Sequence, residues 1–519
     1  MIEKVLVANR GEIAVRIIRT CREMGIKTVA IYSEVDTDSL HVRMADEATT
    51  FPNVRGYLDM DFIIKIAQET GAQAIHPGYG FLSENHVFAA KCQEAGLIFI
   101  GPDAKAIELM GDKARARETM MAAGVPVTPG SNGIVSSADE GLKVAGSIGY
   151  PVLIKAVAGG GGRGMRLART TEELPGAFDG AQSEANTFFK NAEVYIEKFL
   201  EDCRHVEIQI VADNYGQVVY LGERDCSIQR RNQKLIEEAP SPAVGPELRE
   251  RMGKVAVAAA QAVNYSGVGT LEFLLDKYGN FYFMEMNTRI QVEHPVTEFV
   301  YGLDLVKEQL KVASGEPLGY TQSMIKINGW AIECRINAEN PETFVPSPGE
   351  IKFFRPPGGY GIRLDSAIFN GSIVSPYYDS LVAKLIGFGQ TRMEAIKRMQ
   401  RALAEFEIKG VETTLPLHQK ILGDPDFQRG KFTTKYMQEK MDKFNTQSTG
   451  SMFAQEHKPE FMQGEEDQSL NPEIVAVMAA AIAAYGEAGK DSFRIVGIKP
   501  INKSCSPWRL AGLYELLGR

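Results

Sequence analysis

The chain has 519 residues, enough for about three to four domains. Its residues are 44% hydrophobic and 24% charged, which is typical of globular proteins and argues against a mainly disordered, fibrous or membrane-embedded chain. Fifty-seven Lys and Arg stand against 66 Asp and Glu, so the net charge is −9, and no general affinity for nucleic acid or anionic lipid is expected.

The six cysteines lie far apart and form no C-x-x-C pair, which argues against a disulfide framework and against a structural zinc site. Isolated reduced thiols are typical of a cytoplasmic protein. The start of the chain has no signal-peptide pattern, and no apolar run is long enough to cross a bilayer. We therefore expect a cytoplasmic protein that binds no nucleic acid and spans no membrane.

The N-terminal part alternates short β-branched runs with helical patterns. Strands are predicted at 5–8, 27–32 and 74–76, with helices at about 13–24 and 59–70. Such alternation indicates βαβ units around a parallel sheet. Ligands of such sheets often bind at the carboxyl ends of the strands. The Gly turn after the first strand and the His-Pro-Gly-Tyr-Gly segment after the third are therefore either ligand sites or structural turns.

A glycine-rich run, Gly159–Gly164, lies between the strand-like segments Tyr150–Ala156 and Met165–Ala168. It lacks the Gly-Lys-Ser/Thr sequence and the following helix of a Walker A loop. Five glycines in six residues carry a conformational-entropy cost that a plain turn does not require. We predict a lid over a triphosphate, with Lys155 before it and Arg163 within it.

Residues 269–287 predict a β-hairpin that turns at its Tyr-Gly pair. With the turn centred there, Glu272 faces Glu285, and Leu274 faces Phe283. Opposed carboxylates among apolar neighbours destabilise a hairpin unless a cation lies between them. The sequence therefore indicates a metal site, and the alternative is a solvated acidic hairpin.

Asn287 shares the face of the two glutamates because side chains alternate along a strand. Carboxylate and amide oxygens suit Mg²⁺ or Mn²⁺, completed by phosphate oxygens. Arg289 and Glu293 follow closely, so one could bind a small anion and the other could remove its proton. The basic segment 229–234 is either a further anion-binding group or a solvated patch.

Seven motifs, in the same order along the chain, resemble those of the biotin carboxylase component of biotin-dependent carboxylases, an ATP-grasp fold. The resemblance extends from Met1 to about Lys443. The motifs are A-N-R-G-E-I-A, H-P-G-Y-G-F-L-S-E-N, M-G-D-K, G-G-G-G-R-G-M, R-D-C-S-I-Q-R-R-N-Q-K, E-M-N-T-R-I-Q-V-E-H-P-V-T-E and E-C-R-I-N-A-E.

The resemblance implies a multi-domain α/β architecture. We expect a Rossmann-like N-terminal biotin carboxylase domain at 1–112, an ATP-grasp lid domain with the glycine-rich loop at 113–203, and the ATP-grasp core with the C-terminal biotin carboxylase domain at 204–444. Polar, Gln- and Ser-rich residues 445–471 are typical of a linker. Residues 472–519 predict a separate helical extension, which either docks a partner subunit or packs on its own enzyme.

The family chemistry implies that ATP phosphorylates bicarbonate to carboxyphosphate, which delivers CO2 to biotin on a carrier. The implied metal ligands for Mg²⁺ or Mn²⁺ are Glu272, Glu285 and Asn287. The implied ATP-binding residues are Lys113, Lys155, Gly160, Gly161, Gly162, Arg163, Gly164, Glu197, Lys198, His205, Gln229, Asn232, Glu272 and Glu285.

The same resemblance implies a bicarbonate pocket and a biotin site. The pocket residues are Lys234, Arg289, Gln291, Val292 and Glu293, with Glu293 as the base. Tyr79 and Arg335 are implied at the biotin site, with Arg335 stabilising the biotin enolate. Glu293, Arg335, Arg289 and Lys234 are thus the implied catalytic residues.

Two departures from the family pattern bear on function. Many members carry His where this chain has Asn232, and Asn cannot take a proton near neutral pH. The segment R-R-N-Q-K resembles the propionyl-CoA class more than the acetyl-CoA class. No Ala-Met-Lys-Met biotinylation site occurs, so the carrier protein and the carboxyltransferase are expected on other chains, around a homodimer of this one.

Three alternatives stay open at this point. The chain could be another ATP-grasp ligase, or a subunit of the pyruvate carboxylase type. It could also be a non-catalytic scaffold, although the retention of every implied catalytic residue argues against lost activity. Dependence on biotin separates the first alternative from a biotin carboxylase.

Overall fold

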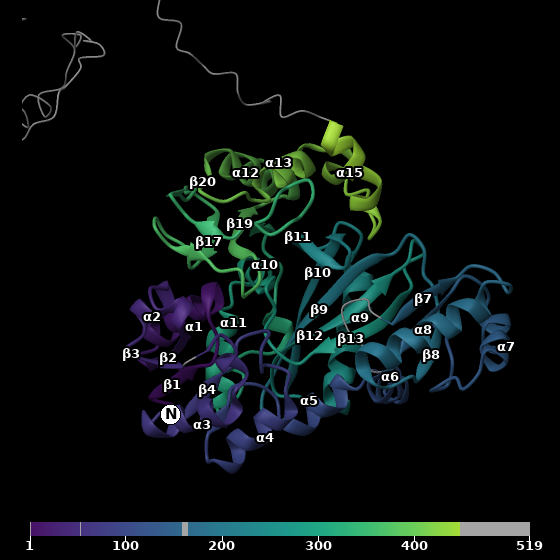
Figure 1. Ribbon diagram of the computed structural model, residues 1–519, viewed down its shortest axis with the longest axis horizontal. Coiled ribbons are helices and arrows are strands. Elements are labelled where there is room, and N and C mark those ends of the chain that lie inside the picture. The colour runs from purple at the N-terminus through teal and green to yellow at the C-terminus, as the bar shows by residue number, and fades with distance from the viewer. Residues whose placement is uncertain (1, 52, 158–163, 447–519) are drawn as a thin grey trace, which may run out of the picture. The chain divides into compact units, whose positions relative to one another are not determined.

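The computed structural model describes residues 2–51, 53–157 and 164–446 (Figure 1). The predictions for Gly160, Gly161, Gly162 and Arg163, for nearly all of the linker and for the C-terminal extension lie outside the described residues. No helix in the described part is long and apolar enough to cross a membrane. The five cysteines in this part are free and buried.

The N-terminal sheet has five parallel strands in the order β3-β2-β1-β4-β5. Its strands are β1 Lys4–Val7, β2 Lys27–Ser33, β3 Glu47–Phe51, β4 Ala74–His76 and β5 Ile98–Phe99. The helices of this region are α1 Gly11–Glu23, α2 Leu40–Met44, α3 Met60–Glu69, α4 His86–Glu94 and α5 Ala104–Gly111, with short 3-10 turns at Glu34–Asp36 and Gly56–Leu58. The three predicted strands and both predicted helices are confirmed, and β3 and β5 are additions.

Strand β1 explains why the sheet is buried on both faces. Val5 and Val7 lie in a cluster with residues of α1, whereas Leu6 and Ala8 lie in a second cluster with residues of α3. A parallel strand covered on both sides is a continuous apolar run and not an alternating one. Helix α3 begins at the predicted place because Asp59 accepts a hydrogen bond from the Phe62 N–H at 3.0 Å.

The lid region contains a three-stranded antiparallel sheet in the order β7-β6-β8. Its elements are α6 Lys113–Ala122, α7 Ala138–Ile148, β6 Val152–Ala156, β7 Met165–Ala168, α8 Leu174–Phe189 and β8 Val194–Lys198. The glycine run thus connects two antiparallel strands, as predicted. Gly164, the last residue of the run, has φ +71°, a conformation that favours glycine.

The third sheet has eight antiparallel strands in the order β13-β12-β9-β10-β11-β14-β19-β17. These strands are β9 Arg204–Ala212, β10 Val218–Arg230, β11 Gln233–Ala239, β12 Gly267–Leu275, β13 Phe281–Asn287, β14 Trp330–Asn337, β17 Ile362–Ser366 and β19 Leu381–Gly389. The accompanying helices are α9 Pro246–Ala262, α10 His294–Tyr301, α11 Leu305–Ala313, α12 Arg392–Glu405, α13 Leu415–Gly423, α14 Pro425–Gln428 and α15 Tyr436–Thr446. Small pairs complete this region: β15 Gly349–Glu350 with β18 Ile373–Val374, and β16 Phe353–Arg355 with β20 Glu407–Lys409, besides a 3-10 turn at Gln322–Met324.

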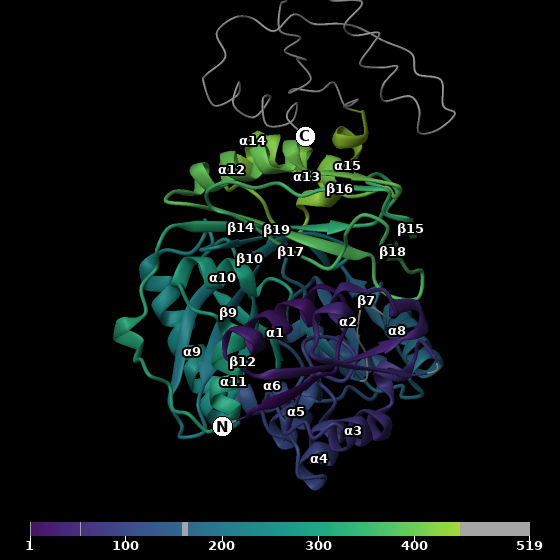
Figure 2. The ribbon, with the colours of Figure 1, turned by 90° about the vertical axis from the view of Figure 1, so that its left-hand side faces the viewer.

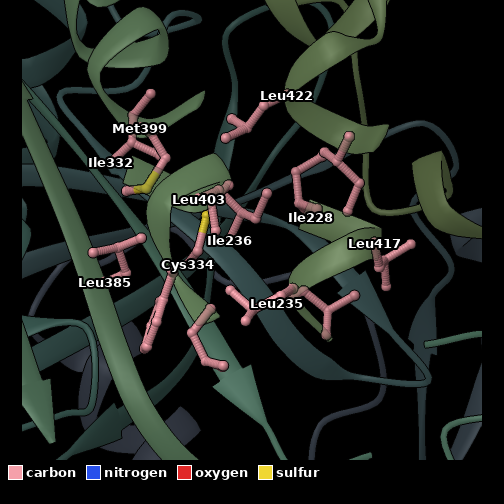
Figure 3. Close-up of a cluster of buried hydrophobic side chains, with 14 of the residues drawn as sticks. Ile228, Leu235, Ile236, Ile332, Cys334, Leu385, Met399, Leu403, Leu417 and Leu422 are labelled. Atoms are coloured by element: carbon pink, nitrogen blue, oxygen red, sulfur yellow. The ribbon is translucent and has the colours of Figure 1, made fainter. Parts of the chain in front are cut away.

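Strands β11, β14 and β19 have an apolar face and a mixed face. Ile236, Cys334 and Leu385 pack with Met399 and Leu403 of α12 in one buried cluster (Figure 3). Helix α10 covers the opposite face (Figure 2). That second face is apolar at one end, and side-chain alternation places Glu237, Glu333, Arg335 and Lys384 at its other end.

The hairpin β12–β13 confirms one predicted pair and corrects another. Glu272 pairs with Glu285 as expected, but Phe283 pairs with Phe273 and not with Leu274. The turn centres on Tyr278, one half-residue earlier than predicted, with Gly279 at φ +82°. A bulge at Met284 then adds one residue to β13 and restores the predicted register at the glutamates.

Candidate active site

Lys234 lies at the centre of a cluster of buried carboxylates. Its Nζ atom is 2.7 Å from Glu207, 3.0 Å from Glu272 and 2.6 Å from Glu293. Burial opposes the charge of Lys234, yet the surrounding anionic groups raise its pKa well above the ordinary value. The ammonium therefore stays charged and holds three acidic side chains from different elements together.

The turn before Lys234 gives Asn232 a structural role. Arg230 pairs with Gln233, so β10 and β11 are joined by a two-residue turn. Its residues Arg231 and Asn232 have φ +49° and +67°, which is the conformation of a type I′ hairpin turn. Asn is among the few residues that adopt this conformation readily, and its side chain is exposed at the tip.

Glu293 lies directly before α10, between two cations. One carboxylate oxygen is 2.6 Å from Nζ of Lys234, and the other is 2.9 Å from Nη2 of Arg335. The side chain is 2% exposed. Burial would raise the pKa of Glu293, but these cations hold it below the ordinary value. The group is therefore an anion near neutral pH.

Arg335, on β14, joins Glu293 to a second buried glutamate. Its Nε atom donates to Oε1 of Glu237 at 2.5 Å, and its Nη2 atom donates to Glu293. Burial opposes the charge, but the two carboxylates raise the pKa of Arg335 further above its ordinary value. The guanidinium is held from two sides in a fixed orientation.

The facing glutamates of β12 and β13 have different surroundings. Glu272 accepts hydrogen bonds from Lys234, Asn287 and Gln291, and Nε2 of His205 lies 2.8 Å from its other oxygen. Despite burial, Lys234 and His205 hold the pKa of Glu272 well below the ordinary value. Burial and the charge of Glu272 raise the pKa of Glu285.

This donor set fits a divalent cation. Lys113, 4.0 Å away, is the one cation that forms an ion pair with Glu285 in the described structure. The carboxylate of Glu285 is therefore under-neutralised opposite a second carboxylate, and its 45% exposed side chain leaves a phosphate-bound ion room to approach. The Oδ1 atom of Asn287 accepts from Arg289 at 2.9 Å, so metal binding there requires this hydrogen bond to be shared or released.

Arg289 also contacts a residue from the N-terminal part. Its Nε atom donates to Oε2 of Glu84 at 2.7 Å, and Glu84 also accepts from the Thr288 N–H at 3.2 Å. Glu84 belongs to the H-P-G-Y-G-F-L-S-E-N segment, and no role was predicted for this residue from the sequence. The contact brings that segment to the anion-binding residues.

Two buried cations support the implied bicarbonate pocket and were not predicted. Arg224 donates to Oε1 of Gln291 at 2.7 Å, and Lys384 donates to the carbonyl of Val292 at 2.9 Å. Both side chains are fully buried. Arg224 is the first residue of the motif R-D-C-S-I-Q-R-R-N-Q-K, whereas the signal for Lys384 was a single Lys in an apolar strand pattern.

Two of the residues predicted in the lid, Lys155 and Glu197, pair with each other. Nζ of Lys155 is 2.8 Å from Glu197, and Arg117 lies 3.5 Å from the same carboxylate. Lys198 donates to the carbonyls of Gly149 and Tyr150 at 3.1 and 2.6 Å, so its ammonium faces the lid backbone. Gln229 is half-buried on β10 and pairs with Lys234 in the strand register.

Tyr79 is positioned by the first strand-to-helix turn. Its hydroxyl donates to the carboxylate of Glu12, which lies 3.1 Å from Lys384. The Nδ2 atom of Asn9 donates to the carbonyls of Pro77 and Tyr79, each at 2.7 Å. The polar side chains of this turn thus hold the Pro-Gly segment in place.

The structure brings one group of predicted residues into mutual contact and leaves another apart. Glu293, Arg335, His205, Glu272, Asn287, Arg289 and Gln291 form a connected network around Lys234. In the described chain, Lys155, Glu197, Lys198 and Tyr79 have their polar contacts outside this network.

Three family models match the chain. Residues 1–107 match the biotin carboxylase N-terminal domain, residues 112–321 match the carbamoyl-phosphate synthase L chain ATP-binding domain, and residues 333–439 match the biotin carboxylase C-terminal domain. Together the matches cover most of the described residues.

Curated relatives match at high identity. Biotin carboxylase 1 of Bacillus subtilis is 59% identical over 443 residues, which is 84% of this chain and 98% of that protein. A pyruvate carboxylase subunit of Methanothermobacter thermautotrophicus is 50% identical over 489 residues, which is 93% of this chain and 99% of that protein.

Solved structures of biotin carboxylases are also similar to this chain. The biotin carboxylase domain dimer of Hydrogenobacter thermophilus 2-oxoglutarate carboxylase, in complex with MgADP, ADP and bicarbonate, is 53% identical with a TM-score of 0.82, and the match covers 86% of this chain and 99% of that one. The biotin carboxylase complex from Campylobacter jejuni is 45% identical with a TM-score of 0.82, covering 85% and 99%.

Proposed function

This chain belongs to the biotin carboxylase family, and from that premise we propose how its residues perform the reaction. The chain is an ATP-dependent ligase that carboxylates biotin with bicarbonate. We propose that the biotin is attached to a separate carrier protein, and that a separate carboxyltransferase uses the product.

The observation that carries the proposed chemistry is the position of Glu293 between Lys234 and Arg335. A carboxylate paired with two cations is a weak base. Bicarbonate that binds Lys234 and Arg289 competes for the Lys234 ammonium, so the pKa of Glu293 rises as the substrate arrives. Glu293 then takes the bicarbonate proton while the bicarbonate oxygen attacks the γ-phosphorus of ATP and the bond to ADP breaks.

The facing glutamates Glu272 and Glu285, with Asn287, are suited to hold Mg²⁺ or Mn²⁺, which neutralises the charge of the triphosphate. Lys113 and Lys155, with His205 and Gln229, would bind the nucleotide together with Glu197, Lys198, Asn232 and the glycine-rich run. Because water destroys carboxyphosphate, closure of the lid would also keep solvent out during transfer.

Arg335 would face the ureido oxygen of biotin and stabilise the negative charge that develops when the ureido nitrogen loses its proton. Its double pairing with Glu237 and Glu293 supports this role, since it fixes the guanidinium before the substrate binds. Tyr79, on the segment that reaches Glu84 and Arg289, would line the same site.

The test is ADP release by the full chain with Mg-ATP and bicarbonate, with and without free biotin. Biotin should accelerate the bicarbonate-dependent reaction, and Glu293→Gln should lower it by about 10²- to 10⁴-fold. Glu308→Gln is the matched control, because it neutralises another buried carboxylate whose partner, Lys311 at 2.9 Å, lies on α11. An ATP turnover rate that does not change when biotin is added would contradict the biotin carboxylase reaction and support another ATP-grasp ligase.

Two candidate holoenzymes, an acyl-CoA carboxylase and a pyruvate carboxylase, differ in the acceptor of the carboxyl group. The segment containing Asn232 favours an acyl-CoA carboxylase. A pyruvate carboxylase is the second candidate, because the Methanothermobacter subunit aligns over 93% of this chain at 50% identity, beside 84% at 59% identity for the Bacillus biotin carboxylase. A biotin carboxylase domain dimer in the Hydrogenobacter structure supports a homodimer of this chain.

The acceptor can be identified by purifying the tagged chain with its biotinylated partner and supplying labelled bicarbonate with acetyl-CoA, propionyl-CoA or pyruvate. Acid-stable label in one product identifies the acceptor. Repeating the purification after deletion of residues 447–519 tests whether the extension docks the partner, and undiminished partner recovery would contradict that role.

A further inference from the structure

The charged end of the sheet face beneath α10 contains two adjacent glutamates that have no direct part in the proposed reaction. Glu237 on β11 and Glu333 on β14 are directly paired across the two antiparallel strands. Both side chains are fully buried, at 0% exposure. Like charges opposite each other destabilise a strand pair, and burial increases the penalty, so these two groups cannot both carry charge without a specific reason.

The two glutamates differ in their partners. Oε1 of Glu237 accepts from Nε of Arg335 at 2.5 Å. Within the described structure neither oxygen of Glu333 has a hydrogen-bond partner. Lys384 on β19 pairs instead with Glu12 at 3.1 Å and donates to the carbonyl of Val292 at 2.9 Å.

This difference decides which of the two is ionised. A buried carboxylate without a hydrogen bond is strongly unfavourable, and protonation removes that penalty. Burial and the charge of Glu237 raise the pKa of Glu333 well above its ordinary value, although Lys384 opposes this. Burial also raises the pKa of Glu237, but Arg335 limits the rise to about 7, so Glu237 ionises above about pH 7 while Glu333 keeps its proton. Two further charged groups act on Glu333: Arg335 on the same strand lowers its pKa, and Glu293 before α10 raises it.

We propose that Glu237 is the positioning residue of Arg335, and that Glu333 keeps its proton so that Glu237 is the single anion beside the guanidinium on that side. The inference rests on the proposed function, because it concerns the residue assigned to biotin. Glu237 contacts both Nε and Nη2 of Arg335, and Glu293 accepts a hydrogen bond from Nη2. The Nη1 donors are then left to face the substrate. An ionised Glu333 would add a second anion next to Glu237. It would offset part of the positive charge that Arg335 presents to biotin.

The alternative is a proton relay, in which Glu333 accepts the proton that Glu293 takes from bicarbonate. The two hypotheses predict different activities for one variant. Glu333→Gln preserves a neutral group of the same shape, so it should be tolerated if Glu333 only stays neutral, whereas a relay would lose its proton acceptor.

The experiment compares Glu237→Gln, Glu333→Gln and Glu238→Gln in the full chain. Glu238 is the matched control, because it is the next residue on β11, is likewise buried and binds Arg392 at 2.7 Å on the opposite face of the sheet. ADP release is measured with bicarbonate alone and with bicarbonate plus biotin, and thermal unfolding is recorded for each variant.

Glu237→Gln should lower the biotin-stimulated rate by about 10- to 100-fold, the usual effect of a misplaced catalytic group. The KM for ATP should stay within about twofold, which a general loss of structure would not allow, and the biotin-independent ATPase should fall less than the biotin-stimulated rate, because Glu293 keeps its pairing with Lys234. Glu333→Gln should stay within about threefold on both rates, and Glu238→Gln should change only thermal stability.

Equal biotin-stimulated rates for wild type and Glu237→Gln would overturn the inference, and so would an equally large loss in Glu333→Gln. Should Glu237→Gln fail to fold while Glu238→Gln folds, Glu237→Asp, which keeps the charge on a shorter side chain, replaces it and should lose the biotin-stimulated rate selectively. A wild-type chain that does not respond to biotin would instead contradict the proposed function.

Discussion

Replacement of Arg224 offers a direct test of how the site is held together. This fully buried guanidinium donates to Oε1 of Glu207 at 2.5 Å and to Oε1 of Gln209 at 2.6 Å. It also binds Thr297, Thr270 and Gln291 at 2.9, 3.1 and 2.7 Å. Arg224→Met keeps much of the apolar stem but removes all five hydrogen bonds and leaves Glu207 with Lys234 as its remaining ion-pair partner in the described structure.

The expected destabilisation follows from the groups left behind. Breaking a buried ion pair from one side typically costs about 3 to 5 kcal/mol, and the lower end of that range is expected because Glu207 keeps its pairing with Lys234. Arg224→Lys keeps the charge but has three donors for five acceptors, so it should cost about 1 to 3 kcal/mol. Gln291 also loses the partner of its Oε1 atom, so the KM for bicarbonate should rise about tenfold if that side chain forms the pocket.

Urea unfolding followed by Trp330 fluorescence measures this loss, because Trp330 lies in β14 of the same sheet. A Trp508→Phe background removes the second tryptophan of the chain. Arg401→Met is the control, since it breaks an exposed pair with Glu405 that is worth about 0.3 to 0.5 kcal/mol. A midpoint for Arg224→Met equal to that of the control would refute the argument, and so would a lysine variant as unstable as the methionine variant.

Three other outcomes follow from the same structure. Lys234→Gln should abolish bicarbonate-dependent ADP release, because three carboxylates lose their shared cation, and retained activity would contradict the proposed pocket. Asn232→Val should destabilise the chain by about 1 to 2 kcal/mol in urea because of its positive φ, whereas Asn232→Gly should be nearly neutral. For Glu237, the pKa is raised in the folded state, so its contribution to stability is present below the ordinary glutamate pKa and is lost as pH rises toward about 7. The urea midpoint of Glu237→Gln should therefore fall less than that of wild type between pH 4.5 and 7, and parallel curves would exclude this titration.

The hairpin of Glu272 and Glu285 illustrates how far local sequence reasoning reaches. The pairing of the two carboxylates was predicted because both lie close to a turn with a clear glycine signal. The bulge at Met284 was not predicted, since nothing in the sequence distinguishes an extra residue from a regular strand position. The prediction was right at the glutamates because the bulge offset the half-residue error in the position of the turn.

Local sequence reasoning could not show that three buried charged residues, Arg224, Lys384 and Glu237, support the site. Each lies in the middle of a strand, and its partners come from residues far away in the chain, as for Arg224 with Gln291 and for Lys384 with Glu12. Their importance depends on the order of strands in the eight-stranded sheet, which is a long-range property. A periodic pattern records which face of a strand is buried, but not which strand lies beside it.

The same reasoning explains why the reactive groups are concentrated near the start of α10. Strands β11, β14 and β19 bury apolar side chains against α12 on one face, which fixes the sheet, and leave the other face to α10. Near Glu293 that second face carries Glu237, Glu333, Arg335 and Lys384, where a solely apolar face would bury more hydrophobic area. Because each buried charge there requires a partner, the cations and carboxylates hold one another in place before any substrate binds, and the proposed chemistry needs that rigidity.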